Sequence, residues 1–154
     1  MGPAGVIAAE MGLVDVGGFV HGVAERVKAH VVPGDAHVAP AVRQLAEYFR
    51  GSRTTFNLPL DLSQMTAFQQ AVLRMTAVIP FGQTLTYGEV ARRIGHPKAS
   101  RAVGGALKAN PIPIIIPCHR VVGAGGRLVG FSAPGGLGTK ASLLHFEAAK
   151  MEPV

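Results

Sequence analysis

The 154-residue sequence has a single cysteine, Cys118, and no tryptophan. One cysteine excludes an internal disulfide, and without cysteine partners it does not form a structural zinc site. No apolar run approaches the length that spans a bilayer, and residues 1–18 lack the basic start and apolar core of a signal peptide. We therefore expect a soluble cytoplasmic protein with no membrane partner.

Acidic residues are scarce in the second half of the chain. Residues 1–62 carry five Lys and Arg against six Asp and Glu, whereas residues 63–154 carry ten against three. A basic half fits a surface that binds a polyanion such as nucleic acid, but a solvated basic face that binds nothing would give the same totals. Charge alone leaves both interpretations open.

The composition and pattern of residues 1–62 predict a small α/β domain. Short apolar stretches alternate with Gly over residues 5–20, which is typical of a strand pair. Residues 38–51 predict a helix that stops at Gly51. The expected apolar face of this helix consists of Val42, Leu45, Ala46 and Phe49. The proline-interrupted residues 52–64 are the candidate linker to a second domain.

The second domain, residues 63–154, is predicted to begin with three helices. The first covers residues 66–79 and directs Phe68, Val72, Leu73 and Ile79 inward. Thr86 and Glu89 stand in capping-box spacing at the start of the second, and Ser100 is the expected N-cap of the third. Two short helices joined by a turn resemble a helix-turn-helix, although an ordinary helical hairpin inside an enzyme gives the same pattern.

Three prolines precede the cysteine, at positions 111, 113 and 117. The prolines in residues 111–117 disfavour a helix and favour an extended path into Cys118. Residues 121–131 then predict a hairpin, and residues 139–150 a last helix. The expected apolar anchors of that helix are Leu143, Leu144 and Phe146.

By residue type alone, Cys118 is more often a small buried hydrophobe than a nucleophile. A nucleophile needs thiolate character, a base and an open direction of attack. His119 follows directly, but neighbours in an extended segment point to opposite sides, so this base would act through a bridging water. The carboxylates of the second half that could orient it are Glu89, Glu147 and Glu152. Thioredoxin and deaminase sites need a second cysteine, which the chain lacks, and no distant histidine stands in a recognisable papain-like signature; a cysteine that reacts once and is consumed needs none of these features.

The motif "IPCHRVVG", together with "YGEVARRIGHPKASRAVGGALKANPIPI" before it and "GFSAPGGLGTKASLLHFE" after it, closely resembles the O6-alkylguanine-DNA alkyltransferases. The resemblance covers residues 56–147. It implies an α/β (α+β) fold with a ribonuclease-H-like N-terminal domain and a winged-helix-like C-terminal domain that carries a helix-turn-helix. Members move an alkyl group from guanine O6 in double-stranded DNA to their own cysteine, here Cys118, irreversibly and without a cofactor.

The resemblance also implies roles for four further residues. His119 matches the base that takes the thiol proton through a water, and Glu147 matches the carboxylate that orients it. Tyr87 matches the donor to N3 of the leaving guanine, and Asn110 the residue that braces the active-site turn. Without the resemblance, Tyr87 would be a core tyrosine, Asn110 a helix cap and Glu147 a solvated helix residue.

Contacts with DNA and with the flipped base follow from the same resemblance. Arg101 matches the arginine that members insert into the DNA base stack, where it fills the space left by the flipped nucleotide. The alternative is that Arg101 is one more contact to a DNA phosphate. The small residues after it would allow close approach to the minor groove. The expected DNA contacts are Ser100, Arg101, Ala102, Gly104, Gly105, Lys108 and Arg120. The expected pocket wall is Tyr87, Val121, Phe131, Ser132 and Gly136.

Some members bind zinc in the N-terminal domain through cysteines and histidines. Here that half has no cysteine, and His21, His30 and His37 are loosely spaced, so we expect no metal. We also expect a monomer; cooperative assembly on DNA and repair of O4-alkylthymine stay open. The alternative function is a module that binds the lesion without accepting the alkyl group. Cys118 favours transfer, because binding-only relatives lack this cysteine.

Overall fold

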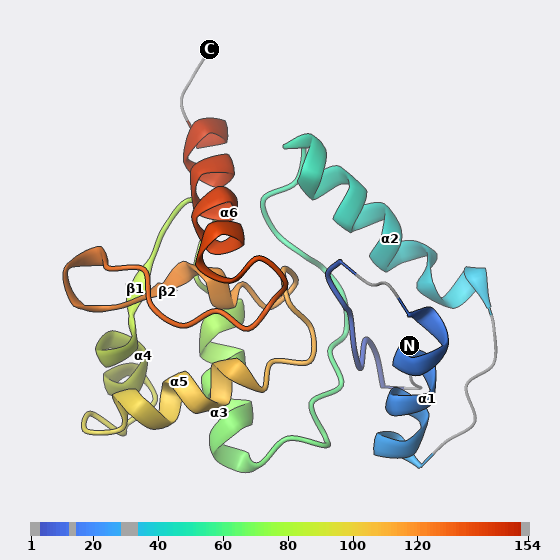
Figure 1. The fold of residues 1–154 in the computed structure, drawn as a ribbon, viewed down its shortest axis with the longest axis horizontal. Helices are drawn as coiled ribbons and strands as arrows, with labels where there is room; N and C mark the ends of the chain where they lie inside the picture. The colour runs from blue at the N-terminus through green and yellow to red at the C-terminus, as the bar shows by residue number, and fades with distance from the viewer. Residues whose placement is uncertain (1–3, 13–14, 29–33, 152–154) are drawn as a thin grey trace.

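The computed structural model describes residues 4–12, 15–28 and 34–151. In chain order the elements are α1 (Val16–Val27), α2 (Asp35–Arg50), α3 (Ala67–Ala77), β1 (Leu85–Thr86), α4 (Tyr87–Arg93), α5 (Ser100–Lys108), η1 (Cys118–Arg120), β2 (Val121–Val122), η2 (Ala124–Gly126) and α6 (Gly136–Met151). Figure 1 shows α1 and α2 on the right and the later elements in the centre and on the left. Within the described ranges no helix is both long and apolar enough to cross a membrane.

The N-terminal part is helical where a strand pair was predicted. Val6 forms only an isolated parallel bridge with Leu60. The stretch expected to be the second strand instead begins α1, because the Asp15 side chain accepts a hydrogen bond from Gly18 N–H at 2.9 Å and so caps the helix. The strand-pair prediction was therefore wrong; residues 13–14, which fall inside it, lie outside the described ranges.

The second helix, α2, buries only part of the predicted face. Leu45 packs against both cores as predicted, whereas Val42 and Phe49 are 60% and 54% exposed, and Tyr48 and Gln44 are buried instead. Gln44 can be buried because its amide group is paired at both ends, donating to Asn57 O and accepting from Asn57 N–H. The prediction was wrong for Val42 and Phe49 because the hydrophobic pattern carries no information about this backbone partner.

Helices α3, α4 and α5 pack against one another and supply seven of the fifteen buried residues of the larger core. The predicted capping box at the start of α4 is confirmed: Thr86 Oγ1 accepts from Glu89 N–H at 3.2 Å, and Glu89 Oε2 accepts from Thr86 N–H at 2.7 Å. The predicted cap of α5 was wrong, since Ala99 is the N-cap and Ser100 is already helical. Fully buried side chains of this core are Val72, Leu73, Val90 and Val103.

The segment between α5 and Cys118 is a tight turn and not the extended path that was predicted. Pro113 and Ile116 form an isolated bridge, and Ile116 N–H donates to Ile112 O at 2.9 Å. Ile114 has a φ of 71°, a left-handed conformation that costs about 1–2 kcal/mol for an L-residue. Its buried side chain packs with side chains of α2 and α6, and this packing holds the turn in place.

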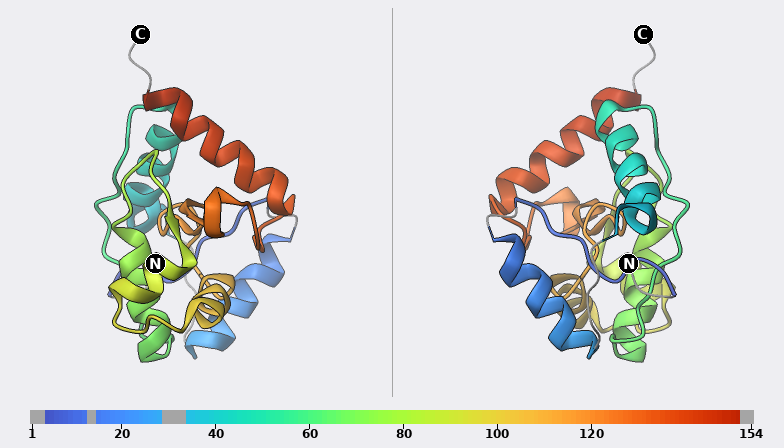
Figure 2. Two further views of the ribbon diagram at one scale, coloured as in Figure 1. Left: turned by 90° about the vertical axis from the view of Figure 1, so that its left-hand side faces the viewer. Right: turned by 90° about the vertical axis from the view of Figure 1, so that its right-hand side faces the viewer.

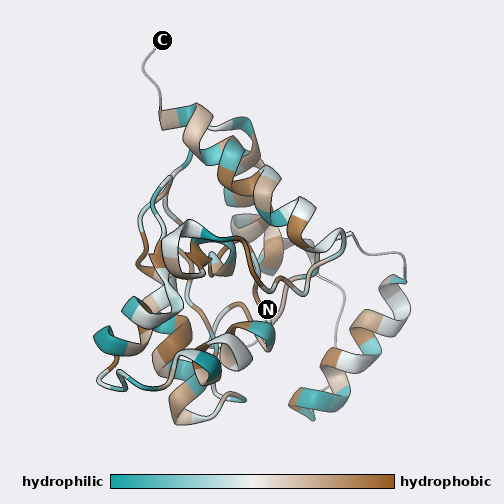
Figure 3. Ribbon diagram, turned by 60° about the vertical axis from the view of Figure 1, so that its left-hand side comes forward, coloured by the Kyte–Doolittle hydropathy of each residue, from teal (hydrophilic) through white to brown (hydrophobic). Residues whose placement is uncertain are grey.

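The two short strands tie the helix pair α4 and α5 to the cysteine segment. Strand β1, directly before α4, pairs in parallel with β2, directly after η1. The predicted hairpin after Cys118 was wrong: Gly123 N–H donates to Arg127 O at 2.8 Å, which closes a loop instead of pairing a second strand. Helix α6 runs along the upper edge of the molecule (Figure 2), with Leu143 buried as predicted. Hydrophobic segments gather in the interior between these elements (Figure 3).

Candidate active site around Cys118

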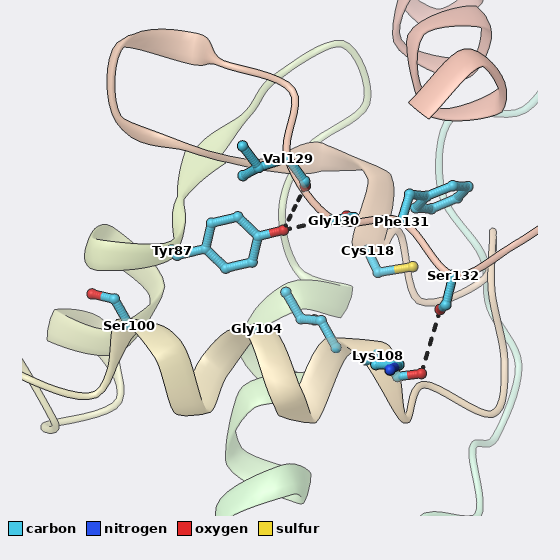
Figure 4. Close-up of a pocket in the computed structure, with 10 residues that line it drawn as sticks. Tyr87, Ser100, Gly104, Lys108, Cys118, Val129, Gly130, Phe131 and Ser132 are labelled. Carbon is cyan, nitrogen blue, oxygen red and sulfur yellow. Dashed lines mark hydrogen bonds between the residues drawn. The ribbon is translucent and has the colours of Figure 1, made fainter. Parts of the chain in front are cut away.

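Cys118 opens onto a cavity of about 500 Å³. The wall is formed by Tyr87, Ser100, Gly104, Leu107, Lys108, Cys118, Val129, Gly130, Phe131 and Ser132. Figure 4 shows Tyr87 and Cys118 on the same side of α5, with the loop of residues 129–132 facing that helix. Two of the predicted wall residues do not line the cavity, because Val121 is fully buried in β2 and Gly136 begins α6.

A hydrogen-bonded asparagine places the cysteine. Asn110, just after α5, donates from Nδ2 to Ile116 O at 3.0 Å and accepts at Oδ1 from Ile112 N–H at 3.0 Å. The amide therefore bridges both ends of the turn that leads into η1. Cys118, the first residue of η1, is thereby held at the cavity wall on a fixed backbone.

The thiol of Cys118 is not activated by its surroundings alone. Burial raises its pKa, and a hydrogen bond with Asn110 and the positive charge of Lys140 offset only part of that effect. A thiol with a raised pKa is mostly protonated near neutral pH, so it needs a base to become a nucleophile.

Glu147 of α6 is a buried, ionised carboxylate. Its oxygens accept hydrogen bonds from Tyr48 Oη at 2.7 Å, from Gly82 N–H at 3.0 Å and from Arg120, whose Nε and Nη2 donate at 2.9 and 2.8 Å. Burial by itself would raise the pKa of Glu147, but hydrogen bonds from His119, Arg120 and the Gly82 amide outweigh it and lower the pKa to about 2.

His119 is fully buried and bonded to that carboxylate, with Nε2 at 2.8 Å from Glu147 Oε1. Because an ionised carboxylate can only accept, Nε2 must carry the proton. Nδ1 is then the acceptor nitrogen, and it is buried without a protein partner. Burial also lowers the pKa of His119, partly offset by Glu147, so the ring is neutral near pH 7. A neutral imidazole with a free nitrogen beside a cysteine is a competent general base.

Lys140 is a part of the site that the sequence analysis missed. Its buried Nζ donates to Val121 O at 2.6 Å and to Val129 O at 3.0 Å, and it lies 5.7 Å from the ring centroid of Tyr87. The Tyr87 hydroxyl donates to the same Val129 carbonyl at 3.0 Å. The one sequence signal was spacing: Lys140 precedes Glu147 by two helical turns, so both lie on the inward face of α6.

The predicted DNA-contacting residues divide into two groups. Six lie on α5, beside the cavity: Arg101, Ala102, Gly105 and Lys108 are exposed, and Ser100 and Gly104 are half-buried in the cavity wall. Arg120 is only 4% exposed, bonds Glu147 and donates from Nη1 to Ile79 O at 2.6 Å. Its assignment as a DNA contact was wrong, since this side chain is committed to a buried ion pair.

Of the three candidate carboxylates, only Glu147 lies against His119. Glu89 is engaged in the α4 capping box, and Glu152 lies outside the described ranges. Of the N-terminal histidines, His30 lies outside them too, and the described residues contain no group of three or more side chains suited to a metal ion.

Family models for 6-O-methylguanine DNA methyltransferase match this chain twice: the ribonuclease-like domain over residues 1–62 and the DNA binding domain over residues 67–149. A Mycobacterium leprae methylated-DNA–protein-cysteine methyltransferase is 49% identical over 116 residues, which are 75% of this chain and 68% of the relative. The crystal structure of Mycobacterium tuberculosis OGT in complex with DNA is 47% identical, with a TM-score of 0.73 over 79% of this chain and 73% of that one. The Pyrococcus kodakaraensis O6-methylguanine-DNA methyltransferase is 30% identical, with a TM-score of 0.54 over 84% and 77%. The protein repairs DNA by direct reversal, through transfer of an alkyl group to a cysteine. The chain therefore belongs to the 6-O-methylguanine DNA methyltransferase family, with a ribonuclease-like domain before a DNA-binding domain.

Proposed function

We propose that this protein removes the alkyl group from O6-alkylguanine in double-stranded DNA and bonds it irreversibly to Cys118. The observation that carries the proposal is the position of the chain's single cysteine, at the wall of a 500 Å³ cavity and directly before a buried His–Glu pair with one free ring nitrogen. A thioether is not hydrolysed at neutral pH, so each molecule acts once.

The thiol proton leaves through His119. A water between the Cys118 sulfur and Nδ1 relays the proton, and the Glu147 carboxylate stabilises the imidazolium that forms. Sγ then attacks the alkyl carbon, the Sγ–C bond forms as the O6–C bond breaks, and the electron pair passes to the guanine.

Tyr87 stabilises the guanine as that negative charge develops. Its hydroxyl lies in the cavity, and burial, followed by the charge of Cys118, raises its pKa, so it stays protonated and able to donate. On substrate binding it exchanges Val129 O for guanine N3. Tyr87 keeps its proton; the guanine anion takes up a proton as the nucleotide leaves the cavity, and the His119 imidazolium gives up the proton that came from the thiol, so the transfer balances.

Duplex DNA lies along α5. A base inside a duplex is out of reach of a thiol in a cavity, so the nucleotide must flip, at a cost of a few kcal/mol for unstacking. Arg101, exposed on α5, fills the vacated stack, and exposed Ala102 and Gly105 allow the helix to approach the minor groove closely. The boundary between the two domains lies near residue 62, and the protein acts as a monomer.

Mass spectrometry of the intact protein tests the proposal. The protein is mixed with a duplex oligonucleotide that contains one O6-methylguanine, and Cys118→Ser serves as the control. We expect one added methyl group per protein molecule and none on the control. Tight binding to the lesion without a mass change would overturn transfer to Cys118 and would leave the alternative, a module that only recognises the lesion.

A further inference from the structure

Tyr48 is a fully buried tyrosine on α2, in the N-terminal domain, whereas every group of the proposed mechanism lies in the C-terminal one. Its hydroxyl donates to Glu147 Oε1 at 2.7 Å, across 99 residues of sequence. The N-terminal domain thus reaches the buried carboxylate directly.

Three side chains converge on the same carboxylate oxygen. Oε1 of Glu147 accepts from Tyr48 at 2.7 Å, from His119 Nε2 at 2.8 Å and from Arg120 Nη2 at 2.8 Å. An oxygen with this many donors shares its charge among them, so the strength of one bond depends on the others. The phenol and the imidazole therefore compete for the same electron density.

The phenol has little freedom to leave this position. Its ring centroid lies 5.6 Å from that of Phe56, 5.9 Å from Phe81 and 5.6 Å from Phe146. Aromatic packing on several sides holds the ring, and burial together with the neighbouring carboxylate raises the pKa of Tyr48, so the hydroxyl remains a donor.

We propose that Tyr48 is a positioning residue for alkyl transfer: its hydroxyl holds the Glu147 carboxylate in the geometry in which Oε1 accepts the Nε2 proton of His119, and so sets the basicity of the imidazole. The inference rests on the proposed function, because it matters for transfer only if His119 is the base. It also gives the N-terminal domain a part in the chemistry.

Removing this hydroxyl has a predictable sign. In Tyr48→Phe the carboxylate loses a neutral donor, directs more negative charge at His119 and stabilises the imidazolium, so the pKa of His119 rises. The other charged or titratable groups that face the His119–Glu147 pair are Arg120 of η1, Lys140 of α6 and the Cys118 thiol. The substitution leaves all of these in place.

The first measurement is the pKa and tautomer of His119 in the free full-length protein, from the ring ¹⁵N shifts in an NMR titration. The second is the single-turnover rate of methyl transfer from an O6-methylguanine duplex as a function of pH. We expect Tyr48→Phe to raise the pKa of His119 by a few tenths of a unit or more, and to move the acid limb of the rate profile to higher pH by the same amount. A 3-fluorotyrosine placed at position 48 alone is a stronger donor and should move both in the opposite direction.

Phe56→Leu is the matched control, since it disturbs the packing around Tyr48 but leaves the hydrogen bond. It should lower the melting temperature without moving the pKa of His119. An unchanged pKa in both Tyr48 variants would overturn the proposal and leave Tyr48 a purely structural residue. A shifted pKa of His119 with an unshifted acid limb of the rate profile would support the coupling of Tyr48 to His119, but it would overturn the role of His119 as the base.

Discussion

Lys140 organises the cavity at the scale of a single residue. Its ammonium group binds carbonyls from both β2 and the loop of residues 129–130, and the Tyr87 hydroxyl bonds the same loop. A buried cation near a thiol favours the thiolate, and this charge opposes the effect of burial on the pKa of Cys118. Lys140 therefore affects both the shape of the cavity and the acidity of the nucleophile.

We expect Lys140→Met to raise the pKa of the Cys118 thiol, because the substitution keeps the apolar stem and removes the positive charge. The pH dependence of Cys118 alkylation by iodoacetamide, followed by mass, measures the effect: the midpoint moves to higher pH and the rate at pH 7 falls several-fold. Lys150→Met, an exposed change on the same helix, is the control. Equal pH midpoints in the two variants would show that Lys140 does not lower the pKa of the Cys118 thiol.

At the scale of an element, helix α5 forms part of the cavity wall and also carries the exposed Arg101. One side of it, including Gly104 and Lys108, forms the cavity wall, and Arg101 is exposed near its start. Its packing against α3 and α4 comes from the buried Val103, Ala106 and Leu107. In the proposed function this helix borders the cavity and faces the duplex, and a rigid α5 then couples DNA binding to the capture of a flipped base.

We predict that Arg101→Ala slows transfer from duplex DNA by roughly tenfold or more, because the arginine offsets part of the few kcal/mol that unstacking costs. Transfer from the free O6-alkylguanine base involves no flipping and should change far less. Single-turnover rates with both substrates make the comparison, with Arg43→Ala on α2 as the exposed-arginine control. Equal slowing on the two substrates would contradict the finger role.

At the scale of the whole molecule, Glu147 links the two domains. Its carboxylate on α6 binds Tyr48 of α2, the Gly82 amide, and His119 and Arg120 of η1, which come from three different parts of the chain. Because its pKa is lowered from 4.5 to about 2 in the folded state, the ionised form stabilises the fold. That contribution is complete above pH 4.5 and is lost as the pH falls through the folded-state value.

We expect the free energy of unfolding to fall by on the order of 3 kcal/mol between about pH 4.5 and pH 2 through this group, at about 1.4 kcal/mol per pKa unit. The lowered pKa of His119 acts in the same direction at higher pH, since the unfolded state takes up that proton first. Urea unfolding at a series of pH values measures the slope. Glu147→Gln should be less stable at pH 7 and show a shallower decline below pH 4.5; a variant with the same slope would assign the acid sensitivity to other carboxylates.

Local signals were predictable wherever the bonding partners are neighbours in sequence. The Thr86–Glu89 capping box and the inward residues Val72 and Leu73 of α3 needed only short-range pattern, and they are confirmed. Arg120 shows the limit: an arginine beside the cysteine, in a basic domain, predicts a DNA contact until its buried carboxylate partner, 27 residues away, is seen. Part of the predicted face of α2 failed for the same reason, because Gln44 is buried by pairing with a backbone 13 residues away.

The sequence by itself determined the family, the single cysteine that can accept an alkyl group, and the helices around the helix-turn-helix, because motif spacing and local capping depend on residues close together in the chain. Only the tertiary structure decided that Arg120 is buried, that Lys140 borders the thiol and that Tyr48 of the N-terminal domain bonds Glu147. These are contacts between distant segments, and their burial, which sets the pKa values of the site, exists only once those segments have packed together.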